Sequence, residues 1–400
     1  MKFRKVPQEN NTFQPFILFG TVILLVGIFV SSTYVYFLLL LGILLLTIYG
    51  LSLFYEKHVD DYLSFDFVKP EVKVYQDDEG YIEMDIEQKG IFPLLNARLT
   101  IEMDDSISFV DGVNQKRRYV TFVSHTFNLM FWEKRRFRFR FKANRRGVST
   151  IRMLKLHLPN VFGFGSIYLT SSHIKQQEIV VYPRRQKVEN MNLLTPQSMG
   201  NHRAKHSLFD HPSLPVGTRD YQRGDSFNKI HWKATAKEGD LQTKVFEKSS
   251  QINWCFLLNV RSKSSLGAPE QIEEWLEQLA YMTQVATKQG IPFKVYVNIT
   301  SIDRIPFVHQ PEGEGEEHYA QTLEMLARLK ILTFTKPYDH LLYYVWKHAS
   351  PPAYIIQIGH TEESDEKYLN QFKQRGSSVV YLRNGKISAS PEQSEVSHHA

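Results

Sequence analysis

GTRDYQRGDSFNKIHWKATAKEGDLQTKVFE, residues 217–247, separates two regions of the chain that have different hydrophobic periodicities. Upstream, apolar residues recur with a period of two, as in β-strands; downstream, apolar runs alternate with amphipathic helical segments. The stretch itself follows neither period, because Arg, Asp, Lys, His and Trp residues are interspersed with Gly, Ser and Thr. We therefore expect it to join two domains and to carry what is specific about the protein.

The composition is that of a folded protein with two or three domains. The chain has 400 residues, of which 42% are hydrophobic and 22% charged, and its net charge is +6. A mildly basic balance suits nucleic acid or an anionic membrane surface. Cys255 is the only cysteine, which excludes an intramolecular disulfide and a zinc cluster built from cysteines.

Two uncharged apolar runs open the chain, at residues 16–30 and 34–54, with a Ser-Ser-Thr turn between them. The second run is long enough to cross a hydrocarbon core of about 30 Å, and the first reaches that length only with its flanking residues. A signal peptide would end in a small-residue cleavage site rather than a second apolar run, and a buried soluble hairpin would carry a polar face. We predict a membrane hairpin of two transmembrane helices over residues 1–58.

The charges that flank the hairpin predict its orientation. Lys2, Arg4 and Lys5 precede the first helix, Lys57 and His58 follow the second, and the turn has no positive charge. The positive-inside rule therefore places both ends of the hairpin, and the soluble part, in the cytoplasm. Since neither run contains a charged residue that could form an ion pathway, we expect a multi-pass anchor in the cell membrane.

Residues 59–185 have the pattern of a β-rich domain. Tyr81–Glu87 alternates apolar with acidic residues, and Arg136–Lys142 alternates cations with phenylalanine. Short strands separated by turn residues predict an antiparallel sandwich of immunoglobulin-like kind. We interpret the cationic face as a solvated strand face, because nucleic acid would need aromatic residues on the same face as the cations. Lipid headgroups are the better functional alternative for this face.

Residues 186–250 comprise a linker followed by the stretch quoted above. The linker is polar and rich in turn residues, and His202, His206 and His211 lack the spacing and the fourth ligand that are typical of a zinc site. We favour a flexible linker over a metal site in this segment.

A motif within the quoted stretch resembles the signature of the domain-of-unknown-function 58 (DUF58) family. That signature begins with Arg-x-Tyr-x-x-Gly-Asp, continues after a short spacer with Ile-Asp/His-Trp-Lys, and ends with Ala-Arg followed by a strand. The matching residues are Arg219, Tyr221, Gly224, Asp225, Ile230, His231, Trp232, Lys233, Ala236 and Leu241. Lys237 replaces the usual Arg. The resemblance extends over nearly the whole chain, including the membrane hairpin.

The alternating charges of this motif suit a salt-bridged network at a domain junction, where the large apolar face of Trp232 would be buried. A catalytic alternative uses His231 as a general base, oriented by Asp220 or Asp225. No nucleophile motif accompanies these residues, so we assign no catalytic residue. The residues expected to serve architecture or partner binding are Arg219, Tyr221, Gly224, Asp225, His231, Trp232 and Lys233.

Residues 251–385 alternate strands with helices, which predicts a doubly wound α/β sheet. Ile252–Val260 is an apolar run typical of a strand that is buried on both faces. Pro269–Gln289 has the Pro start, the early acidic residues and the following Gly that are typical of a helix. The polar residues 386–400 are expected to form a disordered tail.

The α/β region is similar to the von Willebrand factor A-like domain that the family carries. Such domains often bind a divalent cation through Asp-x-Ser-x-Ser after the first strand, because hard oxygen ligands suit Mg²⁺. Here Asn259 stands at the Asp position, and Arg261 and Lys263 stand at the Ser positions. Two cationic side chains oppose cation binding, so we expect a degenerate site without a metal, and no cofactor.

The resemblance implies a membrane-anchored interaction or scaffold protein of a bacterial cell envelope that faces the cytoplasm and is not an enzyme. It also implies a MoxR-type AAA+ ATPase as the partner in assembly or maturation, with a transglutaminase-like membrane protein as a further partner. No nucleic-acid partner is expected. The alternative, from another class, is a hydrolase that uses His231 and Asp225 in a cleft between domains.

Overall fold

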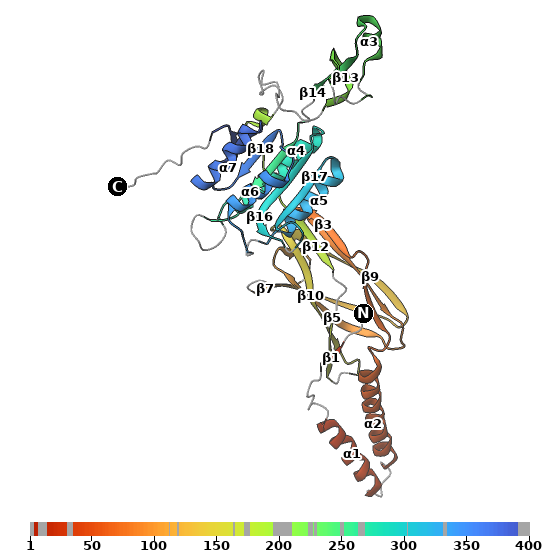
Figure 1. Ribbon diagram of the computed structural model, residues 1–400. Helices are drawn as coiled ribbons and strands as arrows, with labels where there is room; N and C mark the ends of the chain where they lie inside the picture. Colours follow the sequence, from red (N-terminus) through yellow and green to blue (C-terminus); the bar gives the residue numbers. More distant parts are fainter. Residues whose placement is uncertain are drawn as a thin grey trace, which may run out of the picture. The chain divides into compact units, whose positions relative to one another are not determined.

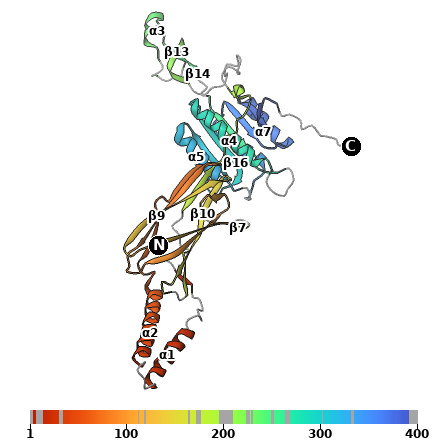
Figure 2. The ribbon, with the colours of Figure 1, turned by 180° about the vertical axis from the view of Figure 1, so that it is seen from behind.

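The computed structural model describes residues 4–6, 14–29, 35–111, 113–117, 120–162, 165–171, 177–194, 210–222, 227, 230–248, 252–262, 269–301, 303–330 and 334–390. The chain divides into two compact units, Met1–Arg184 (unit 1) and Arg185–Ala400 (unit 2), and each is described by itself (Figures 1 and 2). Several residues singled out in the sequence lie outside the described residues, namely His202, His206, Gly224, Asp225 and Lys263.

Two helices, α1 (Gln14–Phe29) and α2 (Val35–His58), lie side by side in unit 1 (Figures 1 and 2). A Cβ added at Gly42 would lie 3.0 Å from Leu24 Cγ, so this glycine allows the helices to approach closely. Among the described residues, one helix is long and apolar enough to cross a membrane: Tyr36–His58, with a mean hydropathy of 2.5. Because α1 has 16 residues, fewer than the ~20 that a span needs, the second span stays a prediction.

Two β-sheets form the rest of unit 1. The smaller sheet has the strand order β2-β4-β9-β6, and the larger has the order β1-β11-β10-β5-β8-β7, with β12 joining β10 to β3. The strands of the smaller sheet are β2 (Leu63–Phe67), β4 (Glu79–Gln88), β6 (Ile107–Phe109) and β9 (Glu133–Ala143). Those of the larger sheet are β1 (Arg4–Val6), β3 (Glu71–Tyr75), β5 (Leu94–Asp104), β7 (Val113–Arg117), β8 (Val120–Leu129), β10 (Gly147–Pro159), β11 (Ser166–Ser171) and β12 (Glu178–Tyr182).

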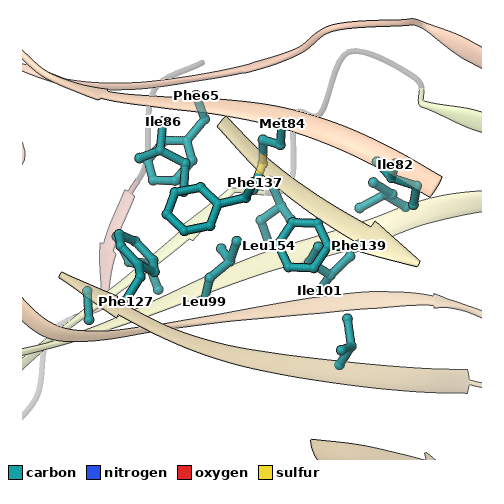
Figure 3. Close-up of a cluster of buried hydrophobic side chains, with 14 of the residues drawn as sticks. Phe65, Ile82, Met84, Ile86, Leu99, Ile101, Phe127, Phe137, Phe139 and Leu154 are labelled. Atoms are coloured by element: carbon teal, nitrogen blue, oxygen red, sulfur yellow. The ribbon is translucent and has the colours of Figure 1, made fainter. Parts of the chain in front are cut away.

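The inner faces of these sheets share one apolar core (Figure 3). Met84 and Phe137 of the smaller sheet lie in the same buried cluster as Leu99 and Phe127 of the larger sheet. Burial of alternate residues is what a period of two predicts, so the prediction of a β-rich, two-sheet domain is confirmed. One strand pair departs from the antiparallel prediction, since β12 and β3 run parallel. The immunoglobulin-like topology stays a prediction.

The acidic and cationic strand faces seen in the sequence are neighbours in the smaller sheet. Glu83 lies opposite Arg138, and Asp85 lies opposite Arg136, in the β4–β9 ladder. The distances are 2.7 Å from Arg138 Nη2 to Glu83 Oε1 and 2.7 Å from Arg136 Nε to Asp85 Oδ1. The hydrogen bond from Arg136 lowers the pKa of Asp85 to about 2. These cations therefore have cross-strand carboxylate partners, which supports the interpretation of a solvated strand face.

A six-stranded sheet organises unit 2, in the order β17-β16-β15-β18-β19-β20. The four central strands are parallel, and β17 and β20 are antiparallel to their neighbours. The strands are β15 (Trp254–Leu258), β16 (Phe293–Thr300), β17 (Phe307–Gly313), β18 (Tyr354–Ile358), β19 (Ser378–Arg383) and β20 (Lys386–Ser388). The helices that cover the sheet are α4 (Ile272–Lys288), α5 (Gly315–Arg328), α6 (Tyr338–His348) and α7 (Glu363–Gln374).

Helices lie on both faces of this sheet. Cys255 and Leu257 are in a buried cluster with residues of α6 and α7. On the other face, the Phe293 ring contacts Phe256 and also His318 of α5, with ring centroids 6.1 and 4.5 Å away. The predicted alternation of strands and helices around a mainly parallel sheet is confirmed. The more specific von Willebrand factor A-like assignment stays a prediction.

Two boundaries of unit 2 differ from those predicted. The start of the predicted linker packs on the α/β domain, because Glu189 N donates to Gly385 O at 2.9 Å and Leu194, in the 3-10 helix Met191–Leu194, is buried. Residues 386–388, predicted as part of the tail, form β20. Segments this short do not show a hydrophobic period, so the pattern in the sequence could not reveal them.

Candidate functional site

The signature stretch forms a strand–helix–strand element in unit 2. Strand β13 (Asp210–Asp220) pairs antiparallel with β14 (Gln242–Lys248), and α3 (Trp232–Glu238) lies in the connection between them. Asp220 lies opposite Gln242 at the end of the ladder, and Asp220 Oδ1 accepts a hydrogen bond from Gln242 Nε2 at 2.7 Å. The described part of the stretch therefore has hydrogen bonds of its own.

His231 caps the N-terminus of α3. Its Nδ1 accepts a hydrogen bond from Ala234 N at 3.0 Å, and its backbone N–H donates to Gln242 O at 2.8 Å. A side-chain acceptor at this position satisfies an N–H group that the first turn of a helix leaves without a partner. The helix ends at Gly239, whose φ is 84° and whose N–H donates to Thr235 O at 2.9 Å. The capping role of His231 was not predicted from the sequence.

The hydrolase alternative requires a carboxylate that orients His231. Asp220 Oδ1 instead accepts from Gln242, and Asp225 lies outside the described residues. The Nδ1 atom of His231 is occupied by its capping bond. The described part of the stretch therefore contains no His–Asp pair of the kind that a general base uses, and the hydrolase alternative is not supported.

Aromatic and cationic side chains form what we call the signature surface: Arg219, Tyr221, Phe227, Trp232 and Lys233. Trp232 is 65% and Phe227 71% exposed, and the ring centroids of Tyr221 and Phe227 are 6.2 Å apart. Every residue of α3 is described, and none is buried. The expectation that Trp232 is buried is therefore wrong, because a seven-residue helix without an apolar stripe has no face to bury. Phe227 was missed, although it is an aromatic residue inside the motif.

A second candidate site lies where the parallel strands end, and Asn259 connects three of them. Its Nδ2 donates to His360 O beyond β18 at 2.7 Å, and its Oδ1 accepts from Asn298 Nδ2 of β16 at 2.8 Å. The same oxygen accepts from Arg261 N at 3.0 Å, and Asn298 Oδ1 accepts from Val260 N at 2.8 Å. The strand order reverses at β15, which is where α/β sheets commonly bind ligands. Here a buried amide network closes that position.

A glycine is required next to this network. Gly359 has a φ of 94°, and a Cβ added to it would lie 2.3 Å from Asn259 O. Only glycine tolerates both the left-handed conformation and this close approach of two backbones. The strand ends are therefore packed directly against each other at this point.

A small hollow of about 40 Å³ lies beside the network, and its lining includes Asp339, Glu362 and Asp365 together with Arg261. Burial, together with the carboxylates of Glu362 and Asp339, raises the pKa of Asp365 to about 6. Asp365 Oδ2 also accepts from Glu362 N at 2.8 Å in the capping box that begins α7. Since drug-sized ligands occupy pockets of ~300–1,000 Å³, this hollow suits a few water molecules rather than an organic substrate.

Asn259, which stands at the Asp position of the expected cation site, serves the fold. Both lone pairs of Asn259 Oδ1 accept hydrogen bonds from N–H groups, and Arg261 is exposed. In the part of the chain that the structure describes, no group of three or more His, Cys, Asp or Glu side chains could hold a metal ion. Lys263 lies outside that part. The Asn at the Asp position thus has a structural role of its own.

A family model matches the sequence from the signature stretch into the α/β region. Residues 217–351 match the model of a family described as "Protein of unknown function DUF58". "Uncharacterized protein YeaD" of Bacillus subtilis (strain 168) is 32% identical over 117 residues, which cover 29% of this chain and 27% of that protein. The match thus spans about a quarter of the length of this curated relative.

Solved structures resemble the chain only weakly. One, described as "AvmM Catalyzes Macrocyclization in Alchivemycin A Biosynthesis", is 11% identical over 30% of this chain and 89% of its own, with a TM-score of 0.22. A non-cellulosomal cohesin from the archaeon Archaeoglobus fulgidus is 8% identical over 30% of this chain and 86% of its own, with a TM-score of 0.19. Similarity at this level establishes neither the fold nor the function of the chain. The sequence comparison supports a narrower statement, that residues 217–351 match the DUF58 family model.

Proposed function

We propose that the chain is a membrane-anchored interaction protein of the DUF58 type, whose signature surface docks a protein partner. The observation that carries the proposal is that Trp232 and Phe227 are exposed on the same short element as the exposed cations Arg219 and Lys233. Trp, Tyr and Arg are the residue types that most often dominate the binding energy of protein interfaces. This combination on one small element favours a docking role over a catalytic one.

The element that presents these side chains is stabilised by other residues. Ile230 is buried and forms a β-bridge with Thr243. Thr235 Oγ1 accepts a hydrogen bond from Gln242 N at 3.0 Å. Since the backbone is already ordered by these contacts, binding a partner through Trp232 loses little additional conformational entropy.

A MoxR-type AAA+ ATPase is the partner that the DUF58 resemblance favours. Arg219 and Lys233, on the same short element as Trp232, suit an acidic and partly apolar docking site, because complementary charge speeds association and fixes its register. The ATPase supplies the nucleotide chemistry, so this chain needs no catalytic residue and no cofactor. A transglutaminase-like membrane protein belongs to the same cell-envelope assembly in this proposal.

The anchor in this proposal is the α1–α2 hairpin, with both of its ends in the cytoplasm. α2 supplies one apolar span, and α1 supplies the other together with its flanking residues. The cationic flanks favour this orientation. The strand before α1 also pairs with β11 of the sandwich that follows α2, which supports a hairpin whose two ends are on one side of the membrane.

Co-purification from membranes tests the docking surface. The full-length chain is expected to retain a AAA+ ATPase, and Trp232→Ala is expected to reduce that retention about tenfold or more, since an aromatic hot spot is worth ~2 kcal/mol. Phe334→Ala is the matched control, because Phe334 is an 89% exposed aromatic residue outside the signature surface. Equal retention by the two variants, or no ATPase with the unchanged protein, contradicts the proposal.

A further inference from the structure

Large apolar side chains are exposed in three loops of unit 1. We call them the loop patch: Tyr62 after α2, Ile91 between β4 and β5, and Met130, Phe131 and Trp132 between β8 and β9. Each exposes half or more of its surface. Soluble proteins rarely gather such residues on their surface unless the patch contacts a partner or a membrane.

The three loops lie at the same end of the two sheets. Gln88, at the end of β4, is opposite Leu63 on one side and Glu133 on the other. In the larger sheet, Leu94 is opposite Leu129. Because these paired residues are the ones that enter or leave the three loops, the ladders bring the whole loop patch to one end of the sandwich.

Helix α2 meets the sandwich at this end. Tyr55 Oη donates to Pro93 O at 3.0 Å, and Gln88 Nε2 donates to Val59 O at 3.2 Å. The side chains of Tyr55 and Val59 are buried in the sandwich core. A hydrocarbon core is crossed by about 20 helical residues, which, counted from Val35, end in the turn Ser52–Tyr55, where α2 contacts the sandwich. The last turn of α2, and the loops that contact it, therefore lie at the depth of the lipid headgroups.

Further contacts fix α2 to the sandwich. Asn160 Nδ2 donates to Ser52 Oγ at 2.8 Å. Lys5 Nζ donates to the carbonyl oxygens of Glu56 and Lys57 at 2.8 Å each, where the end of a helix leaves carbonyl groups without backbone partners. The depth of the loop patch therefore follows from the depth of α2.

Trp132 adds an independent observation. Its φ is 52°, in the left-handed region that bulky residues rarely adopt. Glu133 Oε2 accepts from Met130 N at 2.7 Å and closes the turn, and the Trp132 ring packs edge-on against Phe131 with centroids 5.5 Å apart. Gly or Asn would form this turn with less strain. A tryptophan that is strained and also 68% exposed indicates a function outside the fold.

We propose that the loop patch inserts into the interfacial layer of the bilayer that α2 crosses. Trp and Tyr are favoured at that depth, because the ring body meets the acyl chains while the N–H or O–H group meets water. Lys57 and Lys89 are exposed near the patch and suit anionic headgroups. Insertion fixes the height of the sandwich above the membrane. This inference rests on the membrane anchoring in the proposed function.

Quenching of single fluorophores by brominated lipids tests the depth of the patch in the full-length chain. Burial raises the pKa of Cys255, the only cysteine, to about 12, so its thiol does not compete for the label. One label site is introduced at a time, as Met130→Cys in the patch, Leu44→Cys within α2, or Val110→Cys. Val110 is exposed and lies far from the patch. Its N–H donates to Arg140 O, near the end of β9 that is opposite the patch.

The protein is reconstituted in liposomes of phosphatidylcholine and phosphatidylglycerol, with bromines either near the headgroup or deep in the acyl chain. We expect shallow bromines to reduce fluorescence from position 130 about twofold, deep bromines to quench position 44, and position 110 to be unaffected. Trp132→Gly, which relieves the strained φ, is expected to reduce quenching at 130 and leave 44 unchanged.

The outcomes separate the loop patch from the anchor. Quenching at position 44 without quenching at position 130 contradicts insertion of the loop patch but is consistent with the membrane anchor. No quenching at either position contradicts both. Equal quenching at 130 and 110 indicates adsorption without a specific patch and overturns the inference. If lipids do not quench position 130, and the protein instead forms a concentration-dependent dimer in detergent that shields this position, the patch contacts a second copy. That result also overturns the inference.

Discussion

Replacing Asn259 by Asp tests whether this residue serves the fold rather than a cation site. The substitution keeps the shape of the side chain but removes its N–H donors and adds a negative charge. In the structure Asn259 Nδ2 donates to His360 O at 2.7 Å, and Asn259 is 6% exposed. Asn259→Asp would place a carboxylate oxygen against that carbonyl oxygen, with little water available to solvate it.

The expected loss is worked out from these contacts. A buried hydrogen bond that loses its donor costs about 1–3 kcal/mol, and burial of the new charge adds to that cost. The N–H donors of Asn298 and Arg261 remain and offset part of it. We expect the free energy of unfolding to fall by about 2–4 kcal/mol at neutral pH.

The new carboxyl group also makes a prediction about pH. Burial and neighbouring carboxylates raise its pKa, so the loss should shrink as the pH falls through that raised pKa. Asn259→Ala, which removes all three hydrogen bonds of the side chain without adding a charge, is the control and should show no such pH dependence.

Urea denaturation of the full-length chain in detergent measures the loss, and hydrogen exchange of the amides in β15 and β18 localises it. An Asn259→Asp variant as stable as the parent protein would refute the structural role. Stabilisation of the variant by Mg²⁺ would refute it as well, because the position would then be a latent cation site.

Three further predictions concern stability. Gly359→Ala should lower the free energy of unfolding by about 2–4 kcal/mol, since its Cβ would lie 2.3 Å from Asn259 O; a change below ~0.5 kcal/mol in urea denaturation would contradict the predicted clash. The folded-state pKa of Asp365, about 6, exceeds the ordinary 3.8, so its neutral form stabilises the fold below about pH 4 and that contribution is lost as the pH rises through about 6. Asp365→Asn should therefore make the urea midpoint depend less on pH over this range. A variant whose midpoint changes with pH as much as that of the parent protein would count against the raised pKa. In the sandwich, Phe139→Ala should cost about 3–5 kcal/mol because Phe139 is buried, whereas Arg138→Ala, which breaks an exposed ion pair with Glu83, should cost less than about 1 kcal/mol; equal midpoints would contradict the assigned faces.

Periodicity predicted the parts of the fold in which a pattern repeats. Strands β4 and β9 alternate apolar and charged residues over enough positions to show both the buried face and the solvated one. Their pairing was not predicted, because the register depends on contacts between residues distant in the chain. The N-terminal strand and β20 were missed for a related reason: each has three residues and is ordered by its partner strand rather than by its own sequence.

At the candidate site, the sequence identified residues more readily than their roles. Trp232 was predicted to be buried because it is large and apolar, yet it lies on a short helix that buries none of its residues. His231 was considered as a base, whereas its local environment makes it a helix cap. Asn259 was recognised as an unusual residue at a cation position, but its partner Asn298 is 39 residues away, so the network was not visible in the local sequence.

Site-specific photocrosslinking at position 232 tests most directly the central claim that the signature surface docks an ATPase. A photoreactive phenylalanine analogue replaces Trp232 in the full-length chain in native membranes, and the same analogue replaces Phe334 in the control. We expect an adduct with a MoxR-type AAA+ ATPase from position 232 and none from position 334. No protein adduct from position 232, or the same adducts from both positions, would contradict the claim.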